Sequence, residues 1–231
     1  MKRTPIMLCA ICAWAQSGID VPAIGAIVDP SGALRPVQGV AGNFLLGPAT
    51  ASGILSVACS ELLCLAKTDS KILSATGEVD SPDGPAILAV RADEAIVFFP
   101  QQRVFARWHA DTLEALDWKA EGEVLSIRGS EIALRRDGSL WIVHPDGAVV
   151  DWIADTAGPV LLLEEGVLFA TSDELVLRRT DGSEARFDLA GAESITAFSS
   201  RYAAVRAGNL TYALRIEPRH ESLYLLPGNA P

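Results

Sequence analysis

The chain has 231 residues, of which 49% are hydrophobic and 21% are charged, and its formal net charge is −10. This length builds one domain or two small ones and buries a sizeable core, and the composition excludes a disordered chain. The excess of 29 acidic over 19 basic residues argues against a broad basic surface for nucleic acid or anionic lipid. The sequence therefore predicts a globular protein that does not bind nucleic acid.

The first fifteen residues have the parts of a secretory signal peptide in the right order. Lys2 and Arg3 precede an apolar run over residues 6–13, and Ala13-Trp14-Ala15 supplies a small-x-small cleavage site before Gln16. The apolar run is shorter than the roughly 20 residues that a membrane-spanning helix needs, and no later stretch is long enough to span a membrane. We therefore expect a signal peptide over 1–15 and a soluble domain over 16–231 that is periplasmic or secreted.

The rest of the chain has the pattern of an all-β protein. Short runs of Val, Ile and Leu are separated by turn signals every eight to twelve residues. Asp137-Gly138, Asp146-Gly147 and Asp181-Gly182 are hairpin signals, because a type I′ turn needs a positive φ at both central residues. No window of a dozen residues has a convincing helical period.

An internal repeat is the most informative feature of the sequence. Apolar segments that open with a small residue begin at residues 42, 84, 122, 158 and 192, at intervals of 34 to 42 residues. Each segment is followed by three further short strand patterns, as in the runs 131–135, 139–144 and 148–153 after residues 124–127. Four short strands per unit of this length is the pattern of a β-propeller blade. A β-sandwich or another barrel is the main rival fold, but neither has a regular four-strand repeat.

The repeat resembles that of bacterial exported β-propeller proteins, within the wide class of WD-repeat, quinoprotein-type and NHL-type propellers. The resemblance covers residues 40–228 and concerns architecture, because the Asp117-Trp118 and Asp151-Trp152 pairs have the reverse order of the WD motif. Residues 21–37 are similar to segments of acidobacterial hypothetical exported proteins, a likeness that implies lineage and no activity.

Five four-stranded blades follow an N-terminal hairpin, formed by residues 24–28 and 33–37. A propeller leaves strand edges exposed unless its two ends are tied together. The hairpin resembles the third and fourth strands of a blade. It either augments the last blade as a closing clasp or forms a reduced sixth blade.

No group of residues forms a recognisable catalytic, cofactor or metal motif, and we expect no cofactor. His109 and His144 occupy matching places in consecutive repeats, but at the end of a third strand, where neighbouring blades splay apart and cannot share one metal ion. His220 occupies the corresponding hairpin of the last unit. The nucleophile elbow, the zinc-protease helix motif and the phosphate loop are all absent from the sequence.

Four tryptophans, Trp108, Trp118, Trp141 and Trp152, fall in the two middle units. Because all four lie inside strand patterns, the sequence favours burial between blades over a sugar-stacking surface. Exposed indoles would reverse this interpretation.

Cys59 and Cys64 are the two cysteines of the expected mature chain. They flank a four-residue segment between the strand patterns 54–58 and 65–68. If these strands form a hairpin with a two-residue loop, the two cysteines lie directly opposite each other at a separation that a disulfide can bridge. Export to an oxidising compartment favours the bond. Two buried free thiols are the alternative.

Two classes of function agree with these features. The first is a non-catalytic exported propeller that binds a protein, peptide or glycan through loops on one face. The second is a carbohydrate-active hydrolase or lyase that uses carboxylates at the mouth of the axial channel. Fold alone does not separate the two, and the lack of a reactive motif favours binding.

Overall fold

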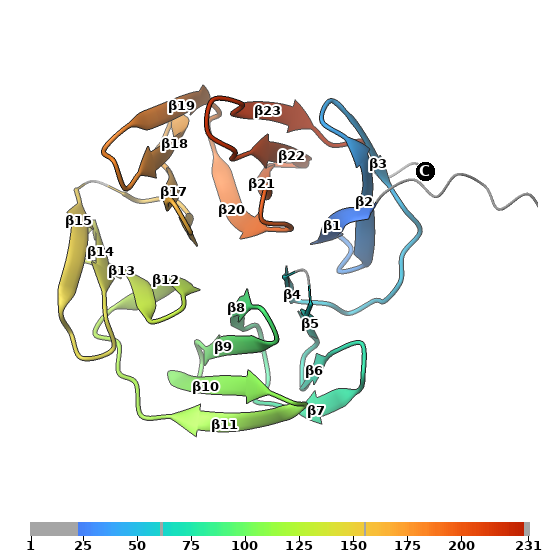
Figure 1. Cartoon of the computed structure of the whole chain (residues 1–231), viewed down its shortest axis with the longest axis vertical. Coiled ribbons are helices and arrows are strands. Elements are labelled where there is room, and N and C mark those ends of the chain that lie inside the picture. Colours follow the sequence, from blue (N-terminus) through green and yellow to red (C-terminus); the bar gives the residue numbers. More distant parts are fainter. Residues whose placement is uncertain (1–22, 61, 155, 229–231) are drawn as a thin grey trace, which may run out of the picture.

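The computed structural model describes residues 23–228, except residues 61 and 155, and its regular structure is entirely β-strand. The strands form six antiparallel sheets, which lie as blades around a ring (Figure 1). Five blades have four strands and one has three, so the protein is an all-β propeller, as the repeat predicts. The expected signal peptide lies outside the described residues.

Each blade is a meander of consecutive strands, and the blades are numbered here in chain order. Blade 1 contains β1 (Ala23–Val28), β2 (Leu34–Val40) and β3 (Asn43–Leu46). Blade 2 contains β4 (Ser56–Cys59), β5 (Cys64–Lys67), β6 (Lys71–Leu73) and β7 (Glu78–Asp80). Blade 3 contains β8 (Ile87–Arg91), β9 (Glu94–Phe99), β10 (Val104–His109) and β11 (Thr112–Leu116).

Blades 4 to 6 follow the same order. Blade 4 contains β12 (Glu123–Arg128), β13 (Glu131–Arg136), β14 (Ser139–Val143) and β15 (Val149–Ile153). Blade 5 contains β16 (Val160–Leu163), β17 (Gly166–Ala170), β18 (Glu174–Arg179) and β19 (Glu184–Asp188). Blade 6 contains β20 (Ala192–Ala197), β21 (Tyr202–Ala207), β22 (Leu210–Arg215) and β23 (Ser222–Leu225).

The turn signals of the sequence lie between strands as expected. Asp137 and Gly138 join β13 to β14 with φ of +51° and +75°, the two positive values that a type I′ turn requires. The first strands of blades 2 to 6 face the axis. We call the face where these strands begin the upper face, and the face where they end the lower face.

Apolar residues between neighbouring blades form the core. The largest side chains that are fully buried include Trp108, Phe99, Phe105 and Phe198. Between blades 3 and 4 the core contains Phe98, Phe105 and Leu134. Each blade therefore buries both faces of its sheet against its neighbours, as expected for apolar strands packed around an axis.

Blade 1 differs from the prediction in two ways. The segment from residue 42, expected to be the first strand of a four-stranded unit, is β3, the outer strand of blade 1. The first strand of blade 2 is β4, which the repeat did not mark. The N-terminal hairpin does not pair with the last blade, because β1 and β2 form their own sheet with β3.

Blade 1 is also reversed relative to its neighbours. Gly25, near the start of β1, lies against the carbonyl of Phe198, just past the lower end of β20. Gly32, in the turn after β1, accepts a hydrogen bond from the amide of Ile54 at the upper start of β4 (2.9 Å). β1 therefore runs from the lower to the upper face, opposite to the first strands of the other blades.

This reversal explains how three strands fit into the ring. A meander of three strands that starts at the lower face ends at the upper face, where β4 begins. Next to the axis, β4 contacts β20 directly. Blade 1 thus corresponds to the outer three strands of a blade and fills the wedge between blades 6 and 2.

The ring closes by side-chain packing between blades 1 and 6. Phe44 of β3 packs edge-on against Tyr202 and Tyr224 of blade 6, with ring centroids 5.5 and 5.6 Å apart. Ile27 and Val37 complete the blade 1 side of this cluster. Of the two alternatives, the structure therefore has a reduced sixth blade, which is blade 1 and contains the hairpin together with β3.

Candidate functional site

A cavity of about 450 Å³ opens near the axis on the upper face, where the first strands of blades 4, 5 and 6 begin. We call it the axial mouth. Its polar lining includes Glu123 of β12, Arg135 of β13 and Glu193 and Ser194 of β20. Gly158 and Pro159, which lead into β16, form the wall between them.

Arg135 fixes the wall of the axial mouth. Its guanidinium donates to Glu123 Oε2 at 2.8 Å, to the carbonyl of Gly158 at 2.5 Å and to the carbonyl of Thr156 at 3.4 Å. One side chain of blade 4 therefore holds the segment that enters blade 5. Gly158 also lies close to β17, because a Cβ at that position would lie 2.6 Å from the carbonyl oxygen of Ala170.

Two β-bulges shape the same mouth. The ladder between β12 and β13 shifts register between Val124 and Ser126, and that between β20 and β21 shifts between Ala192 and Ser194. The residues left out of the two ladders are Leu125 and Glu193, and both line the cavity. Bulges of this kind re-aim side chains and are common beside binding sites. The serine after the first bulge, Ser126, is buried and accepts a hydrogen bond from the amide of Leu162 (3.0 Å), which links β12 to β16.

The two carboxylates of the mouth are exposed and each has an arginine partner in its own blade. The side chain of Glu123 is 63% exposed and pairs with Arg135. The side chain of Glu193 is 51% exposed and lies 3.2 Å from Arg206 Nε. The mouth therefore presents hydrogen-bond acceptors whose charge is largely balanced, an arrangement suited to binding polar groups.

A second, smaller cavity of about 150 Å³ lies between blades 5 and 6 on the lower face. Its centre is Arg179, which donates to Glu221 Oε1 at 2.5 Å and to the carbonyl of Ile216 at 3.1 Å. Burial alone would raise the pKa of Glu221, but backbone amides and the Arg179 guanidinium bond its carboxylate and hold the pKa below its ordinary value. This ion pair joins two blades and leaves its arginine fully engaged.

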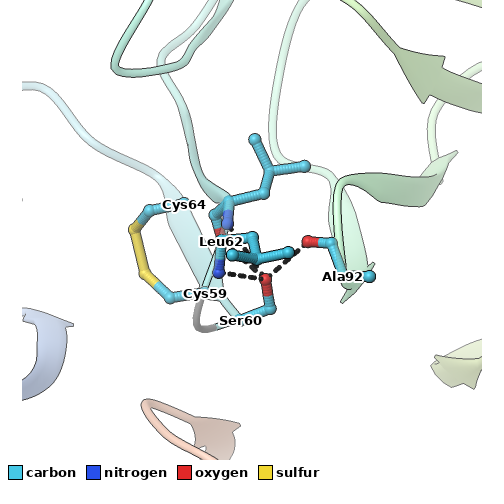
Figure 2. Close-up of a disulfide and its surroundings, with 6 residues drawn as sticks. Cys59, Ser60, Leu62, Cys64 and Ala92 are labelled. Atoms are coloured by element: carbon cyan, nitrogen blue, oxygen red, sulfur yellow. Dashed lines mark hydrogen bonds between the residues drawn. A yellow bond between two sulfur atoms is a disulfide. The ribbon is translucent and has the colours of Figure 1, made fainter.

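The cysteine pair lies on the lower face at the end of β4. Cys59 and Cys64 are directly opposite each other in the β4–β5 ladder, the register that the spacing predicts, and a disulfide joins them (Figure 2). Ser60 stabilises the loop, because its Oγ accepts from the amides of Leu62 and Leu63 at 3.2 and 3.0 Å and donates to the carbonyl of Ala92 at 2.6 Å. The last bond connects the hairpin to blade 3.

The histidines are placed as the repeat predicts. His109 ends β10, His144 follows β14, and His220 lies between β22 and β23. All three thus occupy third-to-fourth strand connections in separate blades. Among residues 23–228, with 61 and 155 set aside, no group of three or more His, Cys, Asp or Glu side chains could hold a metal ion.

One expectation, that all four tryptophans are buried, needs correction. Of the four tryptophans, Trp108 is buried as expected, but Trp152 on the outer strand of blade 4 is 49% exposed. Sequence reasoning missed this exposure because an outer strand and an inner strand have similar patterns here.

These features define the protein as a β-propeller with a concave surface, the axial mouth, where three of its blades meet. The sequence matches no known protein family and no curated protein. Its fold is similar to PorZ, an essential surface component of the type-IX secretion system of Porphyromonas gingivalis, with a TM-score of 0.56 and 13% identity. The likeness covers 91% of this chain but 39% of PorZ, so the chain spans well under half of that protein.

Two further solved structures are less similar to this chain. The WD40 domain of Neurospora crassa Pan2 has a TM-score of 0.49 and 9% identity over 91% of this chain and 80% of the domain. A functionally unknown protein from Desulfotomaculum acetoxidans has a TM-score of 0.49 and 10% identity over 91% of each chain. At such identities the comparisons concern the fold. In the described part of the chain, no helix is long and apolar enough to cross a membrane.

Proposed function

We propose that the protein is a non-catalytic binding protein that takes an extended segment of a peptide or partner protein at the axial mouth. The observation that carries the proposal is the cavity where three blades meet, with Glu123 and Glu193 at its rim. Both carboxylates offer acceptors to a basic side chain, and the Arg135 network holds the cavity in shape without a ligand. A preformed site loses less conformational entropy on binding than a mobile one.

The test is a binding screen of residues 16–231 against a random peptide library, with a glycan array in parallel. Glu193→Gln and Glu123→Gln should each lower the affinity for the selected peptides about tenfold, the effect expected when a charge-assisted contact is removed. Glu94→Gln is the matched control, because Glu94 is equally exposed but begins β9 at the lower face. Unchanged affinity in both mouth variants, or binding of glycans alone at the mouth, would overturn the proposal.

The rival function is a hydrolase or lyase that acts on carbohydrate through two carboxylates at this mouth. A general acid for glycoside cleavage needs surroundings that keep its proton at neutral pH. Glu123 and Glu193 instead have exposed side chains, and each pairs with an arginine of its own blade. The arrangement supports binding over catalysis. Release of reducing ends from polysaccharides by the purified protein, lost in Glu193→Gln, would reverse this preference.

The proposal includes export to the periplasm or the medium. It rests on the order of charge, apolar run and cleavage site in residues 1–15 and on the cysteine pair, which suits an oxidising compartment. PorZ, which shares the fold, is a surface component. N-terminal sequencing of the exported protein should begin at or near Gln16. An intact Met1 in the exported pool would contradict the signal peptide.

A further inference from the structure

An exposed apolar strip lies on the outer strand of blade 4, away from the axial mouth. Val149, Val150 and Trp152 of β15 are 56%, 47% and 49% exposed. No other strand of the described chain has three large apolar side chains exposed to this degree. Clusters of this kind on a monomer's surface are often functional.

Trp152 belongs to an aromatic pair. It lies directly opposite Trp141 in the β14–β15 ladder, with ring centroids 6.2 Å apart and ring planes 57° apart. The guanidinium of Arg136 lies 5.8 Å from the centroid of Trp141. We call Trp141, Trp152 and Arg136 the indole platform. Trp141, its inner indole, packs against the core between blades 3 and 4, and Trp152 is its exposed outer indole.

The platform is bordered by an ion pair that balances its charge. Arg136 donates to the carbonyl of Glu121 at 2.9 Å, and its guanidinium lies 3.7 Å from the carboxylate of the same residue. The side chain of Glu121 is 91% exposed and keeps free acceptor positions. The consecutive residues Arg135 and Arg136 thus serve two separate places, the axial mouth and the indole platform.

The free edge of β15 is poorly suited to accepting another strand. Asp151 lies in the middle of the strand, and Val150 has no partner in the ladder because the register shifts between Ile142 and Val143. A central charge and a bulge are both features that protect sheet edges from strand addition. The face of the sheet, with its exposed indole, is therefore the better docking surface than the edge.

We infer that the indole platform binds a neutral oligosaccharide. The C–H face of a pyranose ring stacks on the exposed indole of Trp152, and Glu121 and Arg136 at the border hydrogen-bond its hydroxyl groups. The balanced charge of the border suits an uncharged ligand, although the whole chain carries a net charge of −10. This site is separate from the axial mouth and adds a second ligand class to the proposed function.

The experiment titrates residues 16–231 with neutral hexasaccharides of glucose, mannose, xylose and N-acetylglucosamine, followed by tryptophan fluorescence and calorimetry. We expect at least one of them to quench the fluorescence and to bind with a saturable isotherm. Trp152→Ala should weaken that binding about tenfold or more, and Trp152→Phe should retain part of it. Leu225→Ala is the control, since Leu225 is 57% exposed on the outer strand of blade 6.

Every variant is first checked for an unchanged melting temperature. Glu193→Gln, a variant of the axial mouth, should leave saccharide binding intact, which separates this inference from the proposed function. If no saccharide binds, or if Trp152→Ala binds as tightly as the unchanged protein, the inference is wrong. Loss of peptide binding in Trp152→Ala without any saccharide binding would assign the platform to a protein partner instead.

Discussion

Asp29 is a buried carboxylate that organises the turn between β1 and β2. Its Oδ1 accepts from the amides of Ser31 and Ala33 at 2.8 and 3.0 Å, and its Oδ2 accepts from Arg35 Nε at 2.6 Å. Burial alone would raise the pKa of Asp29, but these bonds outweigh it and lower the pKa from 3.8 to about 2. The residue is 5% exposed.

The shift predicts how stability depends on pH. Because the pKa of Asp29 is lower in the folded state, its contribution is fully present above pH 3.8 and is lost as the pH falls towards 2. A shift of this size corresponds to about 2 kcal/mol of unfolding free energy. We expect Asp29→Asn to lose about that amount at pH 6 and to differ little from the unchanged protein at pH 2.

Urea unfolding at pH values between 6 and 2 measures the unfolding free energy of Asp29→Asn and of the unchanged protein. Asp146→Asn is the matched control, because Asp146 also accepts a backbone hydrogen bond in a turn (from Ala148, 2.9 Å) but lies in solvent. Equal pH slopes in Asp29→Asn and the unchanged protein would contradict the assignment.

The burial of Lys67 could not be predicted from the sequence. It is fully buried, and its Nζ donates to the carbonyls of Thr68 and Asp69 at 2.7 and 2.6 Å. Burial lowers its pKa, and the charges of Asp69 and Asp83 oppose this effect. In the sequence it is one lysine at the end of an apolar run. Only the turn that folds back over it gives the ammonium group its partners.

The cysteine hairpin is the element whose chemistry the spacing predicts most directly. The register of β4 and β5 places Cys59 opposite Cys64. When the exported protein is purified without reductant and denatured, a thiol reagent should label no cysteine, and reduction should release two thiols. Because the closed loop is so short, replacing both cysteines by alanine should cost at most about 2–3 kcal/mol. Two reactive thiols before reduction would rule the bond out.

Gly25 is the glycine on which the position of blade 1 depends. Its φ is +155°, and a Cβ there would lie 1.8 Å from the carbonyl oxygen of Phe198, an overlap that backbone cannot relieve cheaply. We expect Gly25→Ala to lower the unfolding free energy by about 3 kcal/mol or more, because blade 1 must move away from blade 6.

Gly77→Ala is the control for this substitution, since a Cβ at Gly77 would meet nothing within 4 Å. It should change stability by less than about 0.5 kcal/mol. Thermal unfolding compares the two variants. A Gly25→Ala protein as stable as Gly77→Ala would mean that blade 1 does not lie against Phe198.

At the scale of elements, the repeat predicts blades 3 to 6 well and blade 1 poorly. The segments that start at residues 84, 122, 158 and 192 each lead into a first strand, because a strand beside the axis is apolar on both faces. The segment at residue 42 also contains apolar residues, and Phe44 packs on blade 6, yet the segment is an outer strand. An apolar pattern indicates that a strand is buried, but it indicates neither the direction of the strand nor its distance from the axis.

The candidate sites were less accessible to sequence reasoning than the fold. The axial mouth depends on two bulges and on the bonds of Arg135 to main-chain carbonyls, and neither leaves a pattern in the sequence. Trp152 is exposed because blades 3 and 4 diverge towards their outer strands. The axial mouth arises where strands of three blades meet, at separations along the chain that a repeat does not encode, whereas the indole platform lies within blade 4.

For the whole molecule, closure depends on the packing of blade 1 against blade 6 rather than on a strand shared between them. Phe44, which is 6% exposed, lies between Tyr202 and Tyr224 at the centre of this interface. Phe44→Ala should cost about 3–5 kcal/mol, as for other large-to-small changes in a core. In a domain of this size that corresponds to a fall in melting temperature of about 10 °C. Val40→Ala is the control, because Val40 lies in the same blade at 63% exposure.

Removal of the whole of blade 1 tests the same closure more severely. A chain of residues 47–231 lacks β1 to β3, so it exposes the apolar side of blade 6 that contains Phe198, Ala213 and Leu226. It also leaves the two ends of the ring to meet through the contact between β4 and β20. We expect this chain to melt well below residues 16–231 and to bind a dye for exposed apolar surface. Blade 1 contributes no residue to the lining of the axial mouth. The same melting temperature in both chains would show that five blades close by themselves and that blade 1 is an appendage.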